Sequence, residues 1–288
     1  MMAPALLLRE TAKRLRNAGI PDPETDGALL LSFLCGKAPL ALRLDTETEL
    51  PAALLDRFEA LVTRRLSREP LQYITGEAPF LGRIFRVDPR VLIPRPETEG
   101  LCRAVLEAYP DGASADVLDL CCGSGCIGLS LASERPSFRV ALSDISEDAL
   151  AVTALNAERL SVQVSLHRGD LAAGLPAASF DCIVSNPPYI PSADCGTLQP
   201  EVLCEPRLAL DGGVDGLVFY RRIAAESSRV LRPGGRLFLE IGYGEADGVS
   251  ALLASAGFSR ISVREDFAGI PRIVSAALTP TEDVCSGN

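Results

Sequence analysis

The sequence predicts an α/β fold: a doubly wound sheet with helices on both faces, joined to a small N-terminal helical bundle. Two observations lead to this prediction. From residue 115 onward, short apolar runs alternate with stretches of helical periodicity, which is the pattern of a parallel sheet. In the first 75 residues, apolar side chains recur at helical spacing. Ligands of such sheets bind beyond the carboxyl ends of the strands, so functional residues are expected there.

The N-terminal part predicts helices over residues 4–18, over 23–36 and from about Pro51. Residues 70–96 place alternating apolar side chains among glycines and prolines, a pattern that favours a hairpin-like linker. We therefore expect a helical domain at 1–75, a linker at 76–96 and an α/β domain at 97–288.

Seven strands and five helices are expected in the α/β domain. The strands cover residues 117–120, 138–144, 162–167, 180–185, 236–242, 258–264 and 271–278. The helices cover about 97–108, 125–134, 146–159, 216–230 and 245–256.

The charge is unevenly divided along the chain. Net charge is −10, and the first 75 residues are balanced, so the acidic excess falls in residues 76–288. An acidic domain is a poor match for a phosphate backbone and suits a cationic ligand better. No apolar run is long enough to span a membrane, so a cytoplasmic protein without membrane or direct nucleic-acid contacts is expected. The nine cysteines contain no C-x-x-C pair and are interpreted as reduced, mostly buried thiols, not metal ligands.

A glycine turn follows the first strand of the α/β domain. Gly123, Gly125 and Gly128 match a dinucleotide-binding pattern, and Asp144 ends the next strand at a spacing suited to ribose hydroxyls. Three interpretations compete: a nicotinamide or flavin site, a site for a nucleoside cofactor such as S-adenosylmethionine, and a tight turn that binds nothing. Asp119, just before the glycines, would repel a pyrophosphate but attract the ammonium and sulfonium groups of S-adenosylmethionine.

Two further groups fit the same ligand. Asp170, after the third strand, can accept a hydrogen bond from an adenine amino group, and Leu171 can cover the adenine ring. In register with Asp119 and Asp144, these residues favour S-adenosylmethionine as the cofactor.

A polar and proline-rich stretch follows the fourth strand, where the transferable group of such a cofactor would lie. The Asn186 side chain and the Pro187 main chain offer two carbonyl acceptors. Pro188 holds Pro187 in an extended geometry, and Tyr189 provides a flat face. Together they suit a planar NH2 group that presents two donors.

Asn-Pro-Pro-Tyr resembles motif IV of S-adenosylmethionine-dependent enzymes that methylate planar NH2 nitrogens. Three more stretches narrow the resemblance: Pro70-Leu71-Gln72-Tyr73-Ile74-x-Gly76, Pro94-Arg95-Pro96-Glu97-Thr98-Glu99, and Glu205-Pro206 through Gly212-Gly213-x-Asp215-Gly216-Leu217. The final Asp266-Phe267-Ala268-Gly269-x-x-Arg272 also fits. Over nearly its whole length the chain is similar to the peptide chain release factor glutamine methyltransferases (the HemK/PrmC family).

This resemblance implies a class I methyltransferase fold, with a Rossmann-like seven-stranded sheet and a helical domain that docks the substrate. The implied reaction is methylation of the glutamine amide nitrogen in the Gly-Gly-Gln loop of class I release factors, by a monomer. Cofactor contacts are expected from Asp119, Cys121, Cys122, Gly123, Ser124, Gly125, Asp144, Asp170, Leu171 and Asn186. Substrate contacts are expected from Asn186, Pro187, Pro188 and Tyr189, of which Asn186, Pro187 and Tyr189 would be catalytic.

Some residues carry narrower expectations. Cys121 stands where the family commonly has glycine, and the thiol is expected to fit only with a negative φ. Glu245 stands where glutamine is expected and receives no role. The only histidine, His167, is interpreted as structural, so catalysis by positioning and polarisation is expected in place of a strong base. Arg64, Arg65 and Arg68 are expected to form a solvated helix face.

Other functions remain open from the sequence. A glutamine methyltransferase acting on a ribosomal protein would share these motifs. A nucleic-acid adenine N6-methyltransferase should carry a basic face or a recognition insert, and neither is visible. The intact acidic residues and Asn186 argue against a non-enzymatic adaptor that docks partners through its helices. Measured cofactor binding would separate a nicotinamide dehydrogenase from these alternatives.

Overall fold

The computed structural model describes residues 2–280, which divide into two compact units. The helical unit comprises the chain up to Glu77 together with Gln199–Cys204. The sheet unit comprises Ala78–Leu198 and the chain from Glu205 onward. The chain therefore leaves the sheet unit briefly after Leu198 and returns to it at Glu205.

The helical unit packs its helices around a core of leucines, with Phe58 and Val62. Proline at the first helical positions starts three of the helices, because its fixed φ suits a helix start and its missing N–H is not needed there. The short helices α3 and α5 were not predicted, since five or six residues show no helical period. The helices are α1 (Pro4–Asn17), α2 (Pro23–Cys35), α3 (Pro39–Leu44), α4 (Ala52–Leu66) and α5 (Leu71–Thr75).

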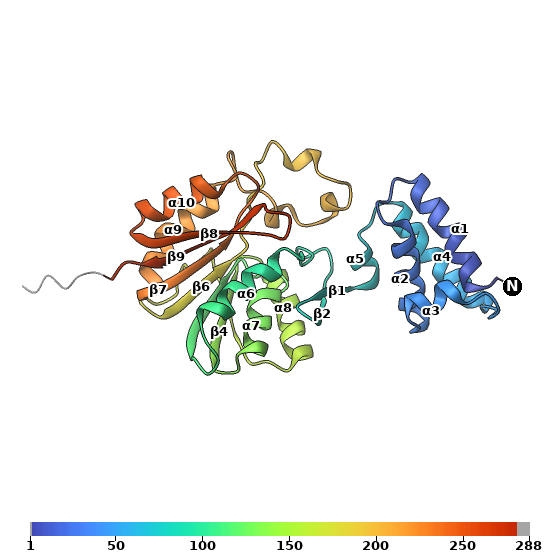
Figure 1. The fold of residues 1–288 in the computed structure, drawn as a ribbon, viewed down its shortest axis with the longest axis horizontal. Coiled ribbons are helices and arrows are strands. Elements are labelled where there is room, and N and C mark those ends of the chain that lie inside the picture. Colours follow the sequence, from blue (N-terminus) through green and yellow to red (C-terminus); the bar gives the residue numbers. More distant parts are fainter. Residues whose placement is uncertain (1, 281–288) are drawn as a thin grey trace, which may run out of the picture. The chain divides into compact units, whose positions relative to one another are not determined.

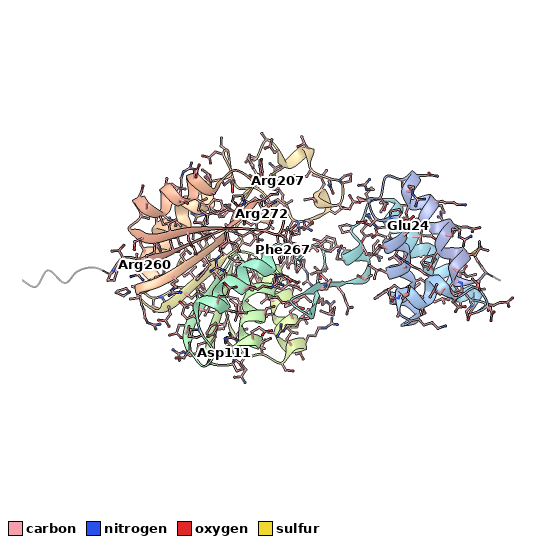
Figure 2. The ribbon with its side chains drawn as sticks, in the orientation of Figure 1. Glu24, Asp111, Arg207, Arg260, Phe267 and Arg272 are labelled. Carbon is pink, nitrogen blue, oxygen red and sulfur yellow. The ribbon has the colours of Figure 1, made fainter. Side chains whose placement is uncertain are left out.

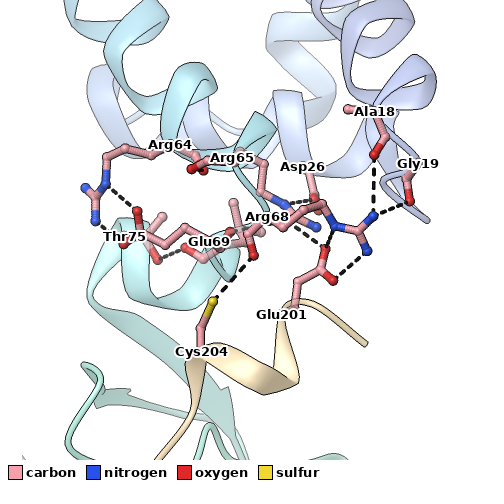
Figure 3. Close-up of polar contacts among 12 residues, drawn as sticks. Ala18, Gly19, Asp26, Arg64, Arg65, Arg68, Glu69, Thr75, Glu201 and Cys204 are labelled. Carbon is pink, nitrogen blue, oxygen red and sulfur yellow. Dashed lines mark hydrogen bonds and ion pairs between the residues drawn. The ribbon is translucent and has the colours of Figure 1, made fainter. Parts of the chain in front are cut away.

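A buried ion cluster joins α2, the end of α4 and the returning segment Gln199–Cys204 (Figure 3). Arg65 is only 4% exposed, and its Nε donates to Asp26 Oδ2 at 2.7 Å. Arg65 Nη1 also lies 2.9 Å from Glu201 Oε1, and Arg68 Nη2 donates to Glu201 Oε2 at 2.6 Å. The expectation of a solvated arginine face is therefore wrong for Arg65, because the segment that covers it comes from a distant part of the sequence.

Replacing Arg65 with alanine is expected to destabilise the helical unit by ~3–5 kcal/mol, because Asp26 and Glu201 would lose a buried cation. Burial already raises the pKa of Asp26 despite its arginine partner. Urea unfolding followed by circular dichroism measures the change. The matched control is Arg64→Ala, which removes a more exposed ion pair with Glu69 and should cost ~0–1 kcal/mol. Equal losses in the two variants would contradict this account of the cluster.

The sheet unit contains seven strands in the order β5-β4-β3-β6-β7-β9-β8 (Figure 1). This confirms the predicted α/β class, with one difference: β9 runs antiparallel to both neighbours. The connection from β8 to β9 is a tight turn, too short for the crossover that a parallel strand requires. The strands are β3 (Ala115–Leu120), β4 (Phe138–Asp144), β5 (Ser165–Arg168), β6 (Phe180–Ser185), β7 (Leu231–Glu240), β8 (Phe258–Glu265) and β9 (Pro271–Leu278).

Asp266 builds the β8–β9 turn. Its Oδ1 accepts hydrogen bonds from the backbone N–H groups of Ala268 and Ile270, and its Oδ2 accepts from Arg272 Nε. The Phe267 side chain at the tip of this turn is fully exposed (Figure 2). These bonds give the Asp266 and Arg272 positions of the final sequence motif a structural role.

Helices cover both faces of the sheet (Figure 1). One apolar core lies under α6 (Thr98–Ala108), α7 (Cys126–Glu134) and α8 (Glu147–Leu160). The other lies under α9 (Val218–Val230) and α10 (Ala246–Ser255). Alternate residues of the central strands β3, β4, β6 and β7 feed the two cores, whereas the edge strands β5 and β8 are more polar and exposed.

The remaining elements are short. A hairpin of β1 (Glu77–Phe80) and β2 (Arg83–Arg86) turns through Leu81 and Gly82, both with positive φ as a two-residue hairpin requires. Three 3-10 turns, Cys195–Thr197, Val202–Cys204 and Arg207–Ala209, follow β6 and were not predicted. Within residues 2–280, no helix combines the length and the apolar character that a bilayer crossing needs.

Candidate functional site

A pocket lies at the carboxyl ends of β3, β4, β5 and β6. These strands are parallel and adjacent in the order β5-β4-β3-β6, so their carboxyl ends lie at the same edge of the sheet. Residues far apart in the sequence therefore meet there. Its free volume, open mouth included, is ≈ 910 Å³, within the range of about 300–1000 Å³ typical of small-molecule sites. The predicted site residues that line it are Cys121, Gly123, Asp144, Asp170, Leu171, Asn186 and Pro188.

The glycine turn forms one wall of the pocket. Gly123 and Gly125 both have positive φ. A Cβ added to Gly123 would meet no atom within 4 Å, so this part of the turn faces open space. A Cβ on Gly125 would lie 2.8 Å from Thr153 Cγ2, because the turn packs tightly against α8 there. The turn therefore presents backbone without a side chain to the pocket at Gly123, while close packing against α8 fixes it at Gly125.

Cys121 corrects one expectation. Its φ is +59°, so the thiol side chain is accommodated in the left-handed region and not at negative φ. This conformation costs ~1–2 kcal/mol for a residue with a Cβ, which explains why glycine suits the position. Cys121 also lines the pocket.

Asp144 ends β4 and holds the glycine turn. Its Oδ2 accepts a hydrogen bond of 2.9 Å from Gly123 N, and its Oδ1 accepts one of 2.9 Å from Ser146 N. Burial raises the pKa of Asp144, and these backbone donors oppose that effect. Each carboxylate oxygen keeps acceptor capacity toward the pocket, which suits a pair of ligand hydroxyls.

Asp119 lies beneath the pocket and does not line it. The side chain is fully buried, and Oδ2 accepts a hydrogen bond of 2.8 Å from Gly128 N. Among the described residues, Oδ1 has no hydrogen-bond partner. Burial raises the pKa of Asp119 to about 8, so a cation nearby would be favoured because it would stabilise the ionised form.

Asp170 and Leu171 form the wall after β5. Arg222 Nη2 lies 2.8 Å from Asp170 Oδ1, whose side chain is 49% exposed. Leu171 is buried and has a φ of +54°, which turns the chain back toward β4 at this edge. Sequence reasoning missed a further part of the lining, made by Arg90, Val91, Leu92, Pro206, Leu208 and Phe219. Of these, Pro206 and Leu208 fall in the Glu205-to-Leu217 stretch that the sequence singled out, without a role in the site.

The Asn-Pro-Pro-Tyr stretch begins where β6 ends. Ser185 Oγ donates to Leu120 O at 2.7 Å, which fixes the end of β6 against β3. Asn186 Nδ2 donates to Thr98 Oγ1 at 3.3 Å, and both prolines are buried. Asn186 and Pro188 line the pocket, whereas Pro187 and Tyr189 do not. Burial raises the pKa of Tyr189 to about 12, so its hydroxyl is neutral.

Gly212 and Gly216 pack closely against the backbone of the Asn-Pro-Pro-Tyr loop. Ile190 N donates to Leu210 O, and Gly212 N donates to Ile190 O at 2.8 Å. A Cβ added to Gly212 would lie 2.6 Å from Tyr189 Cα, and one on Gly216 would lie 2.5 Å from Tyr189 O. The Gly-Gly-x-Asp-Gly stretch is therefore a close-packed support for the Asn-Pro-Pro-Tyr loop.

Replacing Gly212 with alanine is expected to displace this loop and to lower the methyl transfer that the sequence motifs predict by up to about 10²-fold, since small misplacements of reacting groups are costly. Steady-state kinetics measures the loss, and thermal unfolding checks that the variant remains folded. Gly196→Ala is the matched control, because a Cβ there meets nothing within 4 Å. Unchanged kinetics in the Gly212 variant would show that the loop does not depend on this contact.

Glu245 has a structural role that the sequence did not reveal. Its Oε2 accepts a hydrogen bond of 2.7 Å from Gly242 N, at the turn between β7 and α10. Hydrogen bonding to Tyr220 and Gly242 counters the rise in its pKa caused by burial. The carboxylate thus fixes the turn that follows β7.

His167 and Cys126 do not line the pocket. The His167 ring contacts Ala173 O at 2.9 Å, and glycine at 169 leaves room for that ring. Burial raises the pKa of Cys126 to about 12, so this thiol stays neutral. Across the part of the chain that the structure describes, no group of three or more potential ligands is placed to hold a metal ion.

The fold and the pocket together define the class: an α/β methyltransferase domain joined to a helical unit. The family model described as methyltransferase small domain matches residues 100–213, and that described as PrmC N-terminal domain matches residues 7–76. A methyltransferase from Pyrococcus furiosus aligns with a TM-score of 0.52 at 16% identity, over 77% of this chain and 98% of its own, which supports the fold alone.

Full-length relatives identify the family. The release factor glutamine methyltransferase of Cereibacter sphaeroides is 45% identical over 280 residues, covering 96% of this chain and 99% of the relative. That of Caulobacter vibrioides is 41% identical over 272 residues, covering 93% and 94%. The chain belongs to the release factor glutamine methyltransferase family, which confirms the resemblance noted in the sequence.

Proposed function

We propose that this protein transfers a methyl group from S-adenosylmethionine to the side-chain amide nitrogen of the glutamine in the Gly-Gly-Gln loop of class I release factors. One observation carries the proposal. A pocket with a glycine turn and an acidic strand end opens beside Asn186, at the start of the Asn-Pro-Pro-Tyr loop. Family membership supports the choice of substrate.

The pocket fits the proposed cofactor. Bare backbone at Gly123 leaves space, Asp144 offers acceptors for ribose hydroxyls, and Leu171 offers an apolar surface for the adenine ring. Asp119 contributes a buried carboxyl beneath the turn, with no partner for Oδ1 among the described residues, and a nearby cationic ligand would favour its ionised form. Bound S-adenosylmethionine supplies an electrophilic methyl group.

The loop residues act on the amide. Its nitrogen is a poor nucleophile because the lone pair is delocalised into the carbonyl. Asn186 Oδ1 and the Pro187 carbonyl would accept its two N–H groups, orient the nitrogen and increase its electron density. The nitrogen would gain the methyl group as the methyl–sulfur bond of the donor breaks, with the bonding pair left on a neutral thioether, and it would lose one proton to water. No strong base is required, and neither histidine nor lysine occurs among the residues that line the pocket.

A labelled-methyl assay with purified release factor tests this function. Label should enter wild-type release factor and should be absent when the Gly-Gly-Gln glutamine is replaced by alanine. Ribosomal proteins and adenine-containing DNA serve as competing substrates in parallel reactions. Preferential labelling of either, or labelling of a release factor that lacks the glutamine, would overturn the assignment.

We also propose that the helical unit docks the release factor. Phe33 on α2 and the pair Leu40 and Leu44 on α3 are exposed apolar side chains, 48%, 67% and 72% exposed. Such residues favour protein contacts. The protein is further proposed to work as a monomer in the cytoplasm, where its thiols would stay reduced.

Changing both Leu40 and Leu44 to serine should raise KM for the release factor about 10-fold while kcat is kept, since docking binds substrate and transition state equally. Steady-state kinetics with varied release factor provides the measurement. The control is Val263→Ser, an exposed apolar residue on β8. A fall in kcat without a change in KM would argue against docking.

A further inference from the structure

The two ends of the Asn186 amide have opposite chemistry. The proposed function requires the carbonyl oxygen to face the substrate, whereas the NH2 end would compete with the substrate's own N–H groups. Asn186 Nδ2 donates to Thr98 Oγ1 at 3.3 Å. Thr98 is 2% exposed and begins α6, which packs on the same face of the sheet. This contact distinguishes the two ends of the amide.

A second buried group stands beside this contact. The parallel register pairs Ser185 with Leu239, so Asn186 and Glu240 come next on adjacent strands and point to the same face. Glu240 is 3% exposed, and its Oε2 has no hydrogen-bond partner among the described residues. A buried carboxyl at the end of an apolar strand is costly, which favours a functional reason for it.

We propose that Thr98 and Glu240 are positioning residues that set the orientation of the Asn186 amide, an inference that rests on the proposed function. Asn186 Nδ2–H donates to the Thr98 hydroxyl. In the proposed arrangement that hydroxyl donates in turn to the Glu240 carboxylate, whose pKa is raised by burial and lowered by side-chain hydrogen bonding to both Thr98 and Asn186. A carboxylate only accepts hydrogen bonds, so Thr98 must donate to Glu240 and its hydroxyl oxygen is left to accept from Asn186. Asn186 Oδ1 is then turned toward the pocket, and the chain of hydrogen bonds makes it a stronger acceptor.

The protonation of Glu240 follows from its surroundings. Burial raises the pKa of Glu240 to about 7, while hydrogen bonding to Thr98 and Asn186 opposes the rise. Glu97 on one side raises this pKa further and Arg272 lowers it. The titratable and charged groups facing Glu240 are Glu97, Cys102, Cys126, Tyr189, Tyr220 and Arg272. The ionised form orders the chain, so methyl transfer should increase as pH rises through about 7.

Kinetics of four variants tests the positioning role. Thr98→Val should lower kcat about 10- to 100-fold with donor Kd unchanged, and Thr98→Ser should recover most of the loss. Glu240→Leu should lower kcat similarly. Glu240→Gln keeps an acceptor and should remove the rise of kcat near pH 7. The control is Ser227→Ala, which removes from α9 a buried hydroxyl that has no hydrogen-bond partner within residues 2–280. A Gln variant with the wild-type pH profile would overturn the role of Glu240.

A measurement independent of activity separates this proposal from the proposed function. In 15N-labelled protein, the side-chain NH2 signals of Asn186, assigned with Asn186→Ala, should shift as pH passes through about 7. This pH-dependent shift should disappear in Glu240→Gln. In Thr98→Val the chemical shifts of the Asn186 NH2 signals at a fixed pH should differ from those of the wild type. If the chemical shifts of the Asn186 NH2 signals and their pH dependence were the same in both variants as in the wild type, the hydrogen-bond chain would be refuted, even if release factor is methylated. If these signals shift as expected but release factor is not methylated, the proposed function is wrong, whereas the proposed hydrogen bonds among Asn186, Thr98 and Glu240 are supported.

Discussion

Replacing Asn186 with alanine should lower kcat for methyl transfer by about 10²- to 10³-fold, the usual effect of removing one group that stabilises charge in a transition state. The side-chain oxygen of Asn186 is half of the proposed acceptor pair for the substrate amide. The adenosyl part of the donor would contact other residues, so donor affinity should stay within a few-fold. Labelled-methyl kinetics and calorimetric titration measure the two quantities separately.

Asn186→Asp is the informative partner variant. It keeps the size and one oxygen but loses the donor to Thr98 and brings a negative charge toward buried Glu240. It should therefore fail to restore activity. If Asn186→Ala lost donor affinity and kcat by equal large factors, Asn186 would be mainly a cofactor ligand. Thermal unfolding of both variants verifies that the fold is kept.

The second large effect is expected at Asp144. Asp144→Ala removes the carboxylate that holds Gly123 N and that is proposed to bind two ribose hydroxyls. Charge-assisted hydrogen bonds contribute ~1.5–3 kcal/mol each, so donor Kd should rise about 100-fold or more. At saturating donor, kcat should fall much less, because Asp144 does not reach the substrate amide in the proposed arrangement.

Calorimetry with S-adenosylmethionine measures this effect. The matched control is Glu147→Ala, an acidic residue just beyond the same strand end whose side chain is 77% exposed and pairs with Arg168. It should leave donor affinity unchanged. A similar loss in both variants would mean that general negative charge, and not the Asp144 hydrogen bonds, governs binding.

The sequence was most informative where local pattern decides structure. The apolar runs that form β3 and β6 correctly predicted these strands. The glycine turn predicted the sheet edge at which the pocket lies. Short helices and 3-10 turns escaped prediction because they span too few residues to show a period. The reversal of β9 was not predicted either, since strand direction depends on the length of its connection and not on its composition.

What depends on distant contacts could not be predicted. Arg65 looks solvated in its own helix, and only the returning Gln199–Cys204 segment buries it. Half of the pocket lining comes from segments without a motif, such as Arg90 and Phe219. Glu240 did give a signal that went unused: a lone carboxylate within an apolar strand at the functional edge of the sheet.

A crystal structure with S-adenosylmethionine and a glutamine-containing Gly-Gly-Gln peptide would test the central claim most directly. Our account predicts ribose on Asp144, adenine against Leu171, and the transferable methyl group directed at a carboxamide held by Asn186 and Pro187. A donor bound away from the turn at Gly123, or a methyl group pointing away from the proline pair, would contradict it.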